Sequence, residues 1–158
     1  MNSILHSIDG MFAETHSRSS VFLAAVSNEI LFERPRELPR TFTMFSIGEY
    51  LIRSAAEVEQ VIGGITTRLW DDPFEWTLPE ELNSTAKIAE YLDEVESERN
   101  KGFGFFNSDT DLSRSIPAPE RLKTIFELLA GTLARSSHYQ GRAFAIFQMF
   151  SDEKLPQF

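Results

Sequence analysis

Four segments of this sequence repeat apolar residues at every third or fourth position, and no useful stretch alternates apolar with polar residues. The first spacing places apolar side chains on one face of an α-helix, whereas alternation would indicate a β-strand. The segments lie near residues 2–31, 46–70, 84–106 and 118–150. The sequence therefore predicts an all-α protein without a sheet, built as a four-helix bundle.

The second segment has the strongest helix signals. Ser46 and Glu49 have the spacing of a capping box, which satisfies two otherwise unpaired backbone N–H groups at a helix start. The pair Gly63-Gly64 weakens the pattern, because Gly costs about 1 kcal/mol relative to Ala inside a helix. The apolar stripe of this segment consists of Ile47, Leu51, Ala55, Val58, Ile62, Ile65 and Leu69.

The connections between the segments are rich in Pro and polar residues. Asn107 to Pro119 is expected to be a loop, and Pro119 with Glu120 is expected to form the first turn of the last helix, where both residue types are favoured. The tail at 151–158 is also expected to be a loop. Because the first two connections are long, a crossover topology is allowed beside a simple up-down-up-down order.

Length and composition exclude several classes of protein. A chain of 158 residues fits one domain, spanning 1–158, and the absence of Cys excludes disulfides and thiolate metal sites. A net charge of −9 argues against a duplex DNA partner. No apolar run approaches the roughly 20 residues of a membrane span, and the N-terminus lacks the basic start of a signal peptide. We therefore expect a cytoplasmic protein without a nucleic-acid or membrane partner.

Two stretches resemble a known family. FSIGEYLIRSAAEVE (45–59) is similar to the start of the second helix in DinB-like (YfiT-like) proteins, a damage-inducible four-helix family. ARSSHYQGRAFAIFQMF (134–150) resembles the last helix of that family, and the ending KLPQF resembles the Pro that closes many members. The resemblance covers nearly the whole chain and implies a four-helix bundle of up-down-down-up topology that forms a homodimer.

The resemblance also implies a metal site whose ligands are replaced in this chain. Many members hold a divalent metal with one His on the second helix and two on the fourth. These positions fall on Arg53, Arg135 and Tyr139. A guanidinium keeps its proton and offers no lone pair, and a phenol with a pKa of about 10 is a poor ligand. We therefore expect a degenerate metal site, without metal or other cofactor.

Arg53, Arg135 and Tyr139 are instead the candidate ligand-binding residues. Arg135 and Tyr139 are four positions apart and share a helix face, and the resemblance directs Arg53 toward the same cavity. Two guanidiniums and a phenol could bind a small anion. Alternatively, the Arg residues form structural ion pairs, for which Glu57, four positions after Arg53, is a suitable partner.

These residues support two hypotheses of different classes. In the first, the chain is a metal-free binding or interaction protein whose ligand is a small anion. The alternative is an enzyme, either a thiol-dependent transferase, in which Arg53 and Arg135 would hold an anionic thiol cofactor, or a metal-dependent hydrolase-like enzyme. No nucleophile elbow, phosphate loop or dinucleotide fingerprint is present, so the catalytic residues are unknown and the first hypothesis is favoured.

Phe is unusually frequent in this sequence, with 14 residues against two Trp and three Tyr. Aromatic clusters bury large apolar areas, so we expect those at the ends of the third and fourth helices to lie in the core or in a dimer interface. His138 is expected to be exposed or at an interface, and Glu94, Glu96 and Glu98 are expected to face solvent. The clustered residues are Phe103, Phe105, Phe106, Phe144, Phe147 and Phe150.

Overall fold

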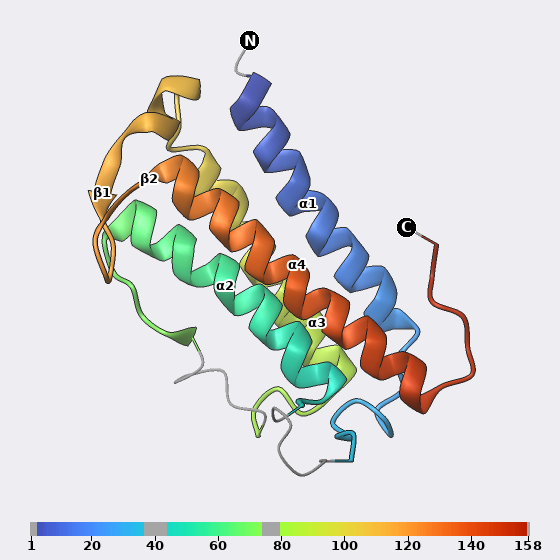
Figure 1. Ribbon diagram of the computed structural model, residues 1–158. Coiled ribbons are helices and arrows are strands. Elements are labelled where there is room, and N and C mark those ends of the chain that lie inside the picture. Colours follow the sequence, from blue (N-terminus) through green and yellow to red (C-terminus); the bar gives the residue numbers. More distant parts are fainter. Residues whose placement is uncertain (1–2, 37–43, 74–79, 158) are drawn as a thin grey trace.

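The computed structural model describes residues 3–36, 44–73 and 80–157, and four long α-helices dominate these parts of the chain (Figure 1). The predicted all-α four-helix bundle is confirmed. None of the helices in the described parts is long and apolar enough to cross a membrane. The helices are α1 (Ser3–Ala24), α2 (Ile47–Thr67), α3 (Thr85–Phe103) and α4 (Ile125–Phe150).

Contacts between the helices show that α1 and α4 run in the same direction. The side chain of Gln140 in α4 donates a hydrogen bond to the carbonyl of Thr15 in α1, at 2.7 Å. Further along both helices, the ring of Phe22 contacts that of Phe147, with centroids 5.4 Å apart. Figure 1 shows α2 running in the opposite direction beside α4.

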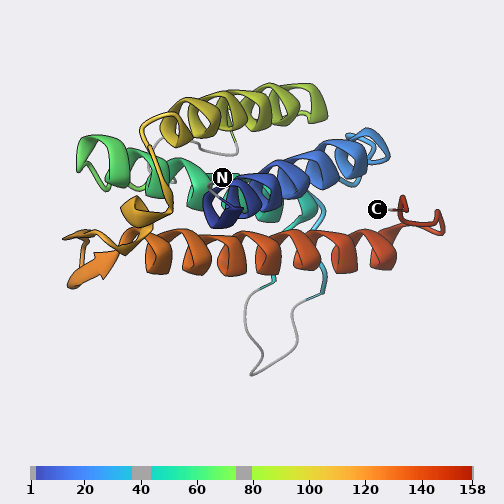
Figure 2. The same cartoon turned by 90° about the horizontal axis from the view of Figure 1, so that it is seen from above.

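The direction of α3 completes the topology. Arg99 near the end of α3 pairs with Asp9 near the start of α1, while Asp93 lies 3.4 Å from His16, further along α1. α3 therefore runs antiparallel to α1 and parallel to α2. This is the expected up-down-down-up order, and seen from above the helices enclose a common interior (Figure 2).

That interior accounts for much of the Phe content. Phe103 and Phe106 are buried, as is Phe147, whereas Phe105 is 66% exposed. Phe144 and Phe150 are half-buried and pack against the core. All four helices contribute large side chains that are almost fully buried, among them Phe12, Phe22, Tyr50, Leu51, Ile88, Leu129 and Ile146.

The first helix is shorter than predicted, because it ends at Ala24 and not near residue 31. Ser27 and Asn28 favour turns, since their side chains compete for backbone hydrogen bonds. Asn28 accepts a hydrogen bond from the backbone N–H of Thr85 at the start of α3 (2.9 Å). Leu31 still enters the core, but from a turn, and its carbonyl accepts a hydrogen bond from Gly48 (2.8 Å).

The predicted start of the fourth helix near residue 118 is wrong, and so is the prediction that no sheet is present. Strands β1 (Ser115–Pro117) and β2 (Leu122–Thr124) form an antiparallel hairpin, which follows the 3₁₀-helix η2 (Asp109–Ser113). Pro119 and Glu120 lie in its turn. α4 begins only after Thr124, whose hydroxyl accepts from the N–H of Glu127 in a second capping box. The hairpin is favoured because it buries Ile116.

The predicted capping box of α2 is confirmed, and the other end of this helix is fixed by Trp70. Arg68 caps the helix in the left-handed conformation, with φ of 62°. The chain then turns back, and the indole N–H of Trp70 donates to the carbonyl of Pro117 (3.2 Å). A Cβ on Gly64 would lie 2.4 Å from the indole ring, so this contact requires glycine.

Replacing Gly64 by Ala therefore tests this contact. Gly64→Ala should lower the free energy of unfolding by about 1–3 kcal/mol, the usual cost of overpacking. Gly10→Ala is the matched control, because a Cβ there meets nothing within 4 Å, and it should stabilise by roughly 0.5–1 kcal/mol. Urea denaturation measures both changes. Equal stabilisation by the two substitutions would contradict the packing of Trp70 on Gly64.

Candidate functional site

α2 and α4 pack side by side in antiparallel directions, and their outer surface holds the three predicted site residues. Glu57 in α2 meets Arg135 in α4, and seven residues along each helix Tyr50 meets Arg142. Between these contacts, the same register brings Arg53 opposite Tyr139. We call this surface the α2–α4 face; it consists of Arg53, Glu57, Arg135, His138, Tyr139 and Arg142, together with Tyr50, which is buried beneath them.

A pair of serines beneath the face fixes this register. The hydroxyl of Ser54 donates to the carbonyl of Ser136 (2.8 Å), and the hydroxyl of Ser136 donates to the carbonyl of Ser54 (2.9 Å). Both residues are buried. Because a buried polar group without a partner costs about 1–3 kcal/mol, a shifted register would be unfavourable.

Arg135 is held in an ion pair. Its Nε donates to Oε2 of Glu57 at 2.6 Å, and one Nη donates to the hydroxyl of Thr132 at 3.2 Å. The structural ion-pair alternative therefore describes Arg135, whose partner Glu57 reaches it across the two helices. The Arg135 side chain is 55% exposed, so this pair adds little stability.

Arg53 lies against an aromatic ring. Its guanidinium is 4.1 Å from the ring centroid of Phe45, a distance at which cation–π attraction is favourable. Phe45 makes an edge contact with Tyr50 at 5.6 Å, and its backbone N–H donates to the Tyr50 hydroxyl at 3.2 Å. The segment before α2 thus orients the Arg53 side chain.

Tyr139 extends the contacts between aromatic rings from α2 to α4. Its ring stacks on that of Tyr50, with centroids 6.2 Å apart and an angle of 26° between the planes. Arg53, Phe45, Tyr50 and Tyr139 therefore form a continuous series of contacts across the two helices. The predicted residues Arg53 and Tyr139 are brought to the same surface, and Arg135 lies beside them in its ion pair.

Arg142 is a residue of this face that the sequence analysis missed. Its Nε donates to Nε2 of His138 at 2.8 Å, and Nη1 donates to the Tyr50 hydroxyl at 3.3 Å. Among the described residues, no carboxylate pairs with this half-buried guanidinium. Its spacing could have revealed it, because Arg142 follows Arg135 by two helical turns and so lies on the same side of α4.

His138 is exposed, as expected. Its ring makes an edge contact with Tyr139 at 5.7 Å, in addition to accepting from Arg142.

Glu49 holds the start of α2 beside the face. It accepts from the backbone N–H of Ser46 at 2.8 Å and from the guanidinium of Arg34. Burial raises the pKa of Glu49, but the hydrogen bonds from Arg34 and Ser46 outweigh burial, and the net result is a lowered pKa. The charges of Arg34 and Glu49 compensate each other.

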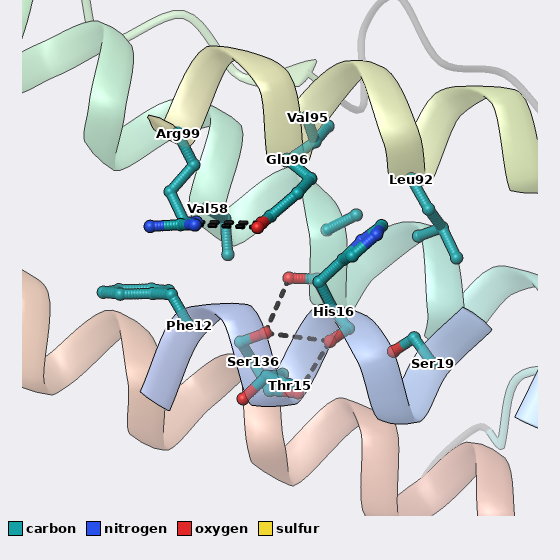
Figure 3. Close-up of a pocket in the computed structure, with 12 residues that line it drawn as sticks. Phe12, Thr15, His16, Ser19, Val58, Leu92, Val95, Glu96, Arg99 and Ser136 are labelled. Atoms are coloured by element: carbon teal, nitrogen blue, oxygen red, sulfur yellow. Dashed lines mark hydrogen bonds and ion pairs between the residues drawn. The ribbon is translucent and has the colours of Figure 1, made fainter. Parts of the chain in front are cut away.

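A second polar cluster lies inside the bundle, around a cavity of about 30 Å³ (Figure 3). Arg99 is 2% exposed and donates to both carboxylate oxygens of Glu96, at 2.8 and 2.7 Å, and to Asp9. Burial lowers the pKa of Arg99, but its bonds to Glu96 and Asp9 outweigh burial and raise it. The expectation that Glu96 faces solvent is therefore wrong.

This cavity is a structural feature of the core. A volume of about 30 Å³ has room for one or two water molecules and for no larger ligand. Arg99 follows the buried residues Leu92 and Val95 by seven and four positions and so lies on the buried side of α3. An Arg at such a position signals a buried charge that needs carboxylates. Four helices line the cavity, through residues that include Phe12, Thr15, His16, Ser19, Ser54, Val58, Leu92, Val95 and Ser136.

Comparison with solved structures identifies the fold. This chain is similar to a DinB-like protein from Bacillus cereus ATCC 10987, with a TM-score of 0.70 and 14% sequence identity. The match covers 91% of this chain and 90% of that one. No family model and no curated protein matches the sequence. The chain therefore has a DinB-like fold, as the sequence resemblance predicted.

The residues at the expected metal positions do not fit a divalent metal ion. Arg53 and Arg135 are guanidiniums that offer no lone pair, and Arg135 is occupied by Glu57. In the described parts of the chain, no group of three or more His, Asp or Glu residues is close enough to hold a metal. The donor set of the α2–α4 face is suited to an anion.

The lowered pKa of Glu49 predicts a pH-dependent contribution to stability. Glu49→Gln should lower the free energy of unfolding at about pH 7 by roughly 1 kcal/mol, the usual value of a helix cap. The wild-type advantage should be complete above the ordinary pKa of 4.5 and be lost as the pH falls through the lower folded-state value.

Urea denaturation at several pH values measures this difference. Glu33→Gln is the control, since Glu33 is exposed on the connection that precedes α2 and its replacement should change the free energy of unfolding little. A stability difference for Glu49→Gln that persists unchanged at acid pH would contradict the role of the ionised carboxylate.

Proposed function

We propose that this chain of DinB-like fold is a cytoplasmic, metal-free binding protein whose ligand is a small anion held on the α2–α4 face. The observation that carries the proposal is Arg142. Its hydrogen-bond partners are an imidazole nitrogen and a phenol oxygen, neither of which neutralises its charge. A half-buried cation whose partners among the described residues are neutral suits an anionic ligand.

The chemistry of Arg142 leaves donors for a ligand besides the two that make its present contacts. A guanidinium has five N–H donors, and the bonds to His138 and Tyr50 use one N–H on Nε and one on Nη1. The remaining donors match the two oxygens of a carboxylate, phosphate or sulfate in a bidentate geometry. Arg142 is therefore the proposed anchor for the anion.

The neighbouring residues of the face support this anchor. Arg53 adds a second positive charge, oriented by the ring of Phe45, and the Tyr139 hydroxyl is an additional donor. Arg135 and Glu57 compensate each other, which leaves Arg142 as the cation with neutral hydrogen-bond partners among the described residues. We propose that Arg53, Tyr139 and Arg142 contact the ligand and that Arg135 forms the edge of the site.

The alternative hypothesis of an enzyme would need a group that activates a thiol or a water molecule. His138 is the residue of the α2–α4 face that could act as a general base, and its Nε2 already accepts a hydrogen bond from Arg142. Since no contact in the described part of the face favours catalysis, we propose binding alone.

Binding can be tested with simple anions in a thermal-shift screen followed by titration calorimetry. Sulfate, phosphate or small carboxylates should raise the melting temperature, because a ligand at 100 times its Kd adds about 2.7 kcal/mol. Arg142→Gln should weaken binding about tenfold or more, as expected for the loss of a charge-assisted hydrogen bond. Arg53→Gln should weaken binding less.

The matched control is Arg121→Gln, because Arg121 is an exposed arginine that pairs with Glu127 away from this face. It should retain full binding. If no anion binds, or if Arg142→Gln binds as well as the wild type, the proposed site is wrong.

We also propose that the chain forms a homodimer. Phe105, Leu122, Phe126 and Met149 leave large apolar side chains exposed, and burying such groups favours association. Sedimentation equilibrium should give twice the chain mass of 18.0 kDa at micromolar concentration. Phe126→Glu should shift the equilibrium toward the monomer, whereas a wild type that sediments only as a monomer would contradict the dimer.

A further inference from the structure

The hydrogen bond between Arg142 and His138 fixes the protonation state of the imidazole. The guanidinium is always protonated and can only donate. Nε2 of His138, at 2.8 Å from Nε of Arg142, must therefore supply a lone pair. In this arrangement His138 is neutral, with its single ring proton on Nδ1.

Among the described residues, His138 contacts a cation and a phenol ring and forms no ion pair with a carboxylate. The cation is Arg142, and the ring is that of Tyr139. A proton on Nε2 would remove the acceptor of Arg142 and place two positive charges at contact distance, which is unfavourable. The charged or titratable residues that share this face from both helices are Tyr50, Arg53, Glu57, Arg135, Tyr139 and Arg142.

A bound anion would favour the protonated form of the His138 imidazole over the neutral form. An oxyanion with two free oxygens could accept one hydrogen bond from Arg142 and one from protonated Nε2 of His138, and its charge would offset the repulsion between the cations. The geometry points to coupled binding: we propose that the anion site of the α2–α4 face takes up its ligand together with one proton, which binds to His138. This inference rests on the proposed anion site and names the regulation of that site.

Coupling between two ligands is reciprocal. If the anion favours the protonated imidazole, lowering the pH must tighten anion binding by the same factor. The affinities are to be compared at about pH 6 and about pH 8, because histidine is the side-chain type whose charge most often changes near neutral pH. The ligand class is an oxyanion with at least two free oxygens, such as a carboxylate, a phosphate monoester or sulfate.

Sulfate is the probe for the test, because its own charge does not change in this pH range. Titration calorimetry on the full chain at about pH 6 and about pH 8 should show binding at least about fivefold tighter at the lower pH. Repeating the titration in buffers with different ionisation enthalpies should show net proton uptake on binding.

His138→Gln is the decisive variant. A glutamine can still accept from Arg142 through its side-chain oxygen but cannot take up a proton, so sulfate should bind with nearly equal affinity at both pH values. His6→Gln is the matched control, since His6 is exposed on α1, away from the face, and it should keep the full pH dependence. Both positions are exposed, and thermal melts verify that the variants fold.

The outcomes separate this inference from the proposed function. Sulfate binding that requires Arg142 but has the same affinity at both pH values would overturn the proton coupling and leave the anion site standing. A pH dependence that survives in His138→Gln would also overturn the coupling. Failure of sulfate to bind at either pH, together with failure of phosphate and carboxylates, would overturn both proposals.

Discussion

The outer face of the bundle depends on the reciprocal hydrogen bonds between Ser54 and Ser136. Each hydroxyl donates to the carbonyl of the other residue, and both residues are buried. This pair holds α2 against α4 in one register, since a shift along the helix would leave two hydroxyls without these partners inside the core. The pairing of Glu57 with Arg135, and of Tyr50 with Arg142, follows from that register. Two small interior side chains thus decide which charges meet on the surface.

Arg99 and Arg142 show how the degree of burial decides whether an arginine needs a carboxylate partner. Arg99 is almost fully buried, and it is compensated by Glu96 and Asp9, because an uncompensated charge in the core is strongly destabilising. Arg142 is only half-buried and is stable with neutral partners. Solvent can screen part of its charge, so the fold does not require a carboxylate there. The same type of side chain therefore needs carboxylates at the buried position and is tolerated with neutral partners at the half-buried one.

The sequence predicted the bundle well because its signals are local, and it failed where tertiary contacts compete with local signals. The start of α2 follows from Ser46 and Glu49. The start of α4 has the same pattern at Thr124 and Glu127, but the favourable Pro119 and Glu120 five residues earlier suggested a longer helix. The arrangement of the candidate residues was predicted in part, because helical spacing placed Arg135 and Tyr139 on one face. The partner of Glu57 depends on the register between α2 and α4, which no spacing within one helix reveals.

The charge on this face gives a physical reason why a DinB-like fold could keep an anion site after losing the ligands of a metal. The resemblance implies that related sites hold a divalent cation with neutral imidazoles, which gives a local charge of about +2. In the proposed site, guanidiniums that are always protonated take the place of that charge, with Arg142 as the anchor. Guanidiniums reproduce the attraction for an anion and its bidentate orientation. They have no open coordination position and cannot lower the pKa of a bound water as a metal does. The proposed anion site would therefore keep the attraction for an anion and lack the means of activating a nucleophile, which agrees with the proposed binding function.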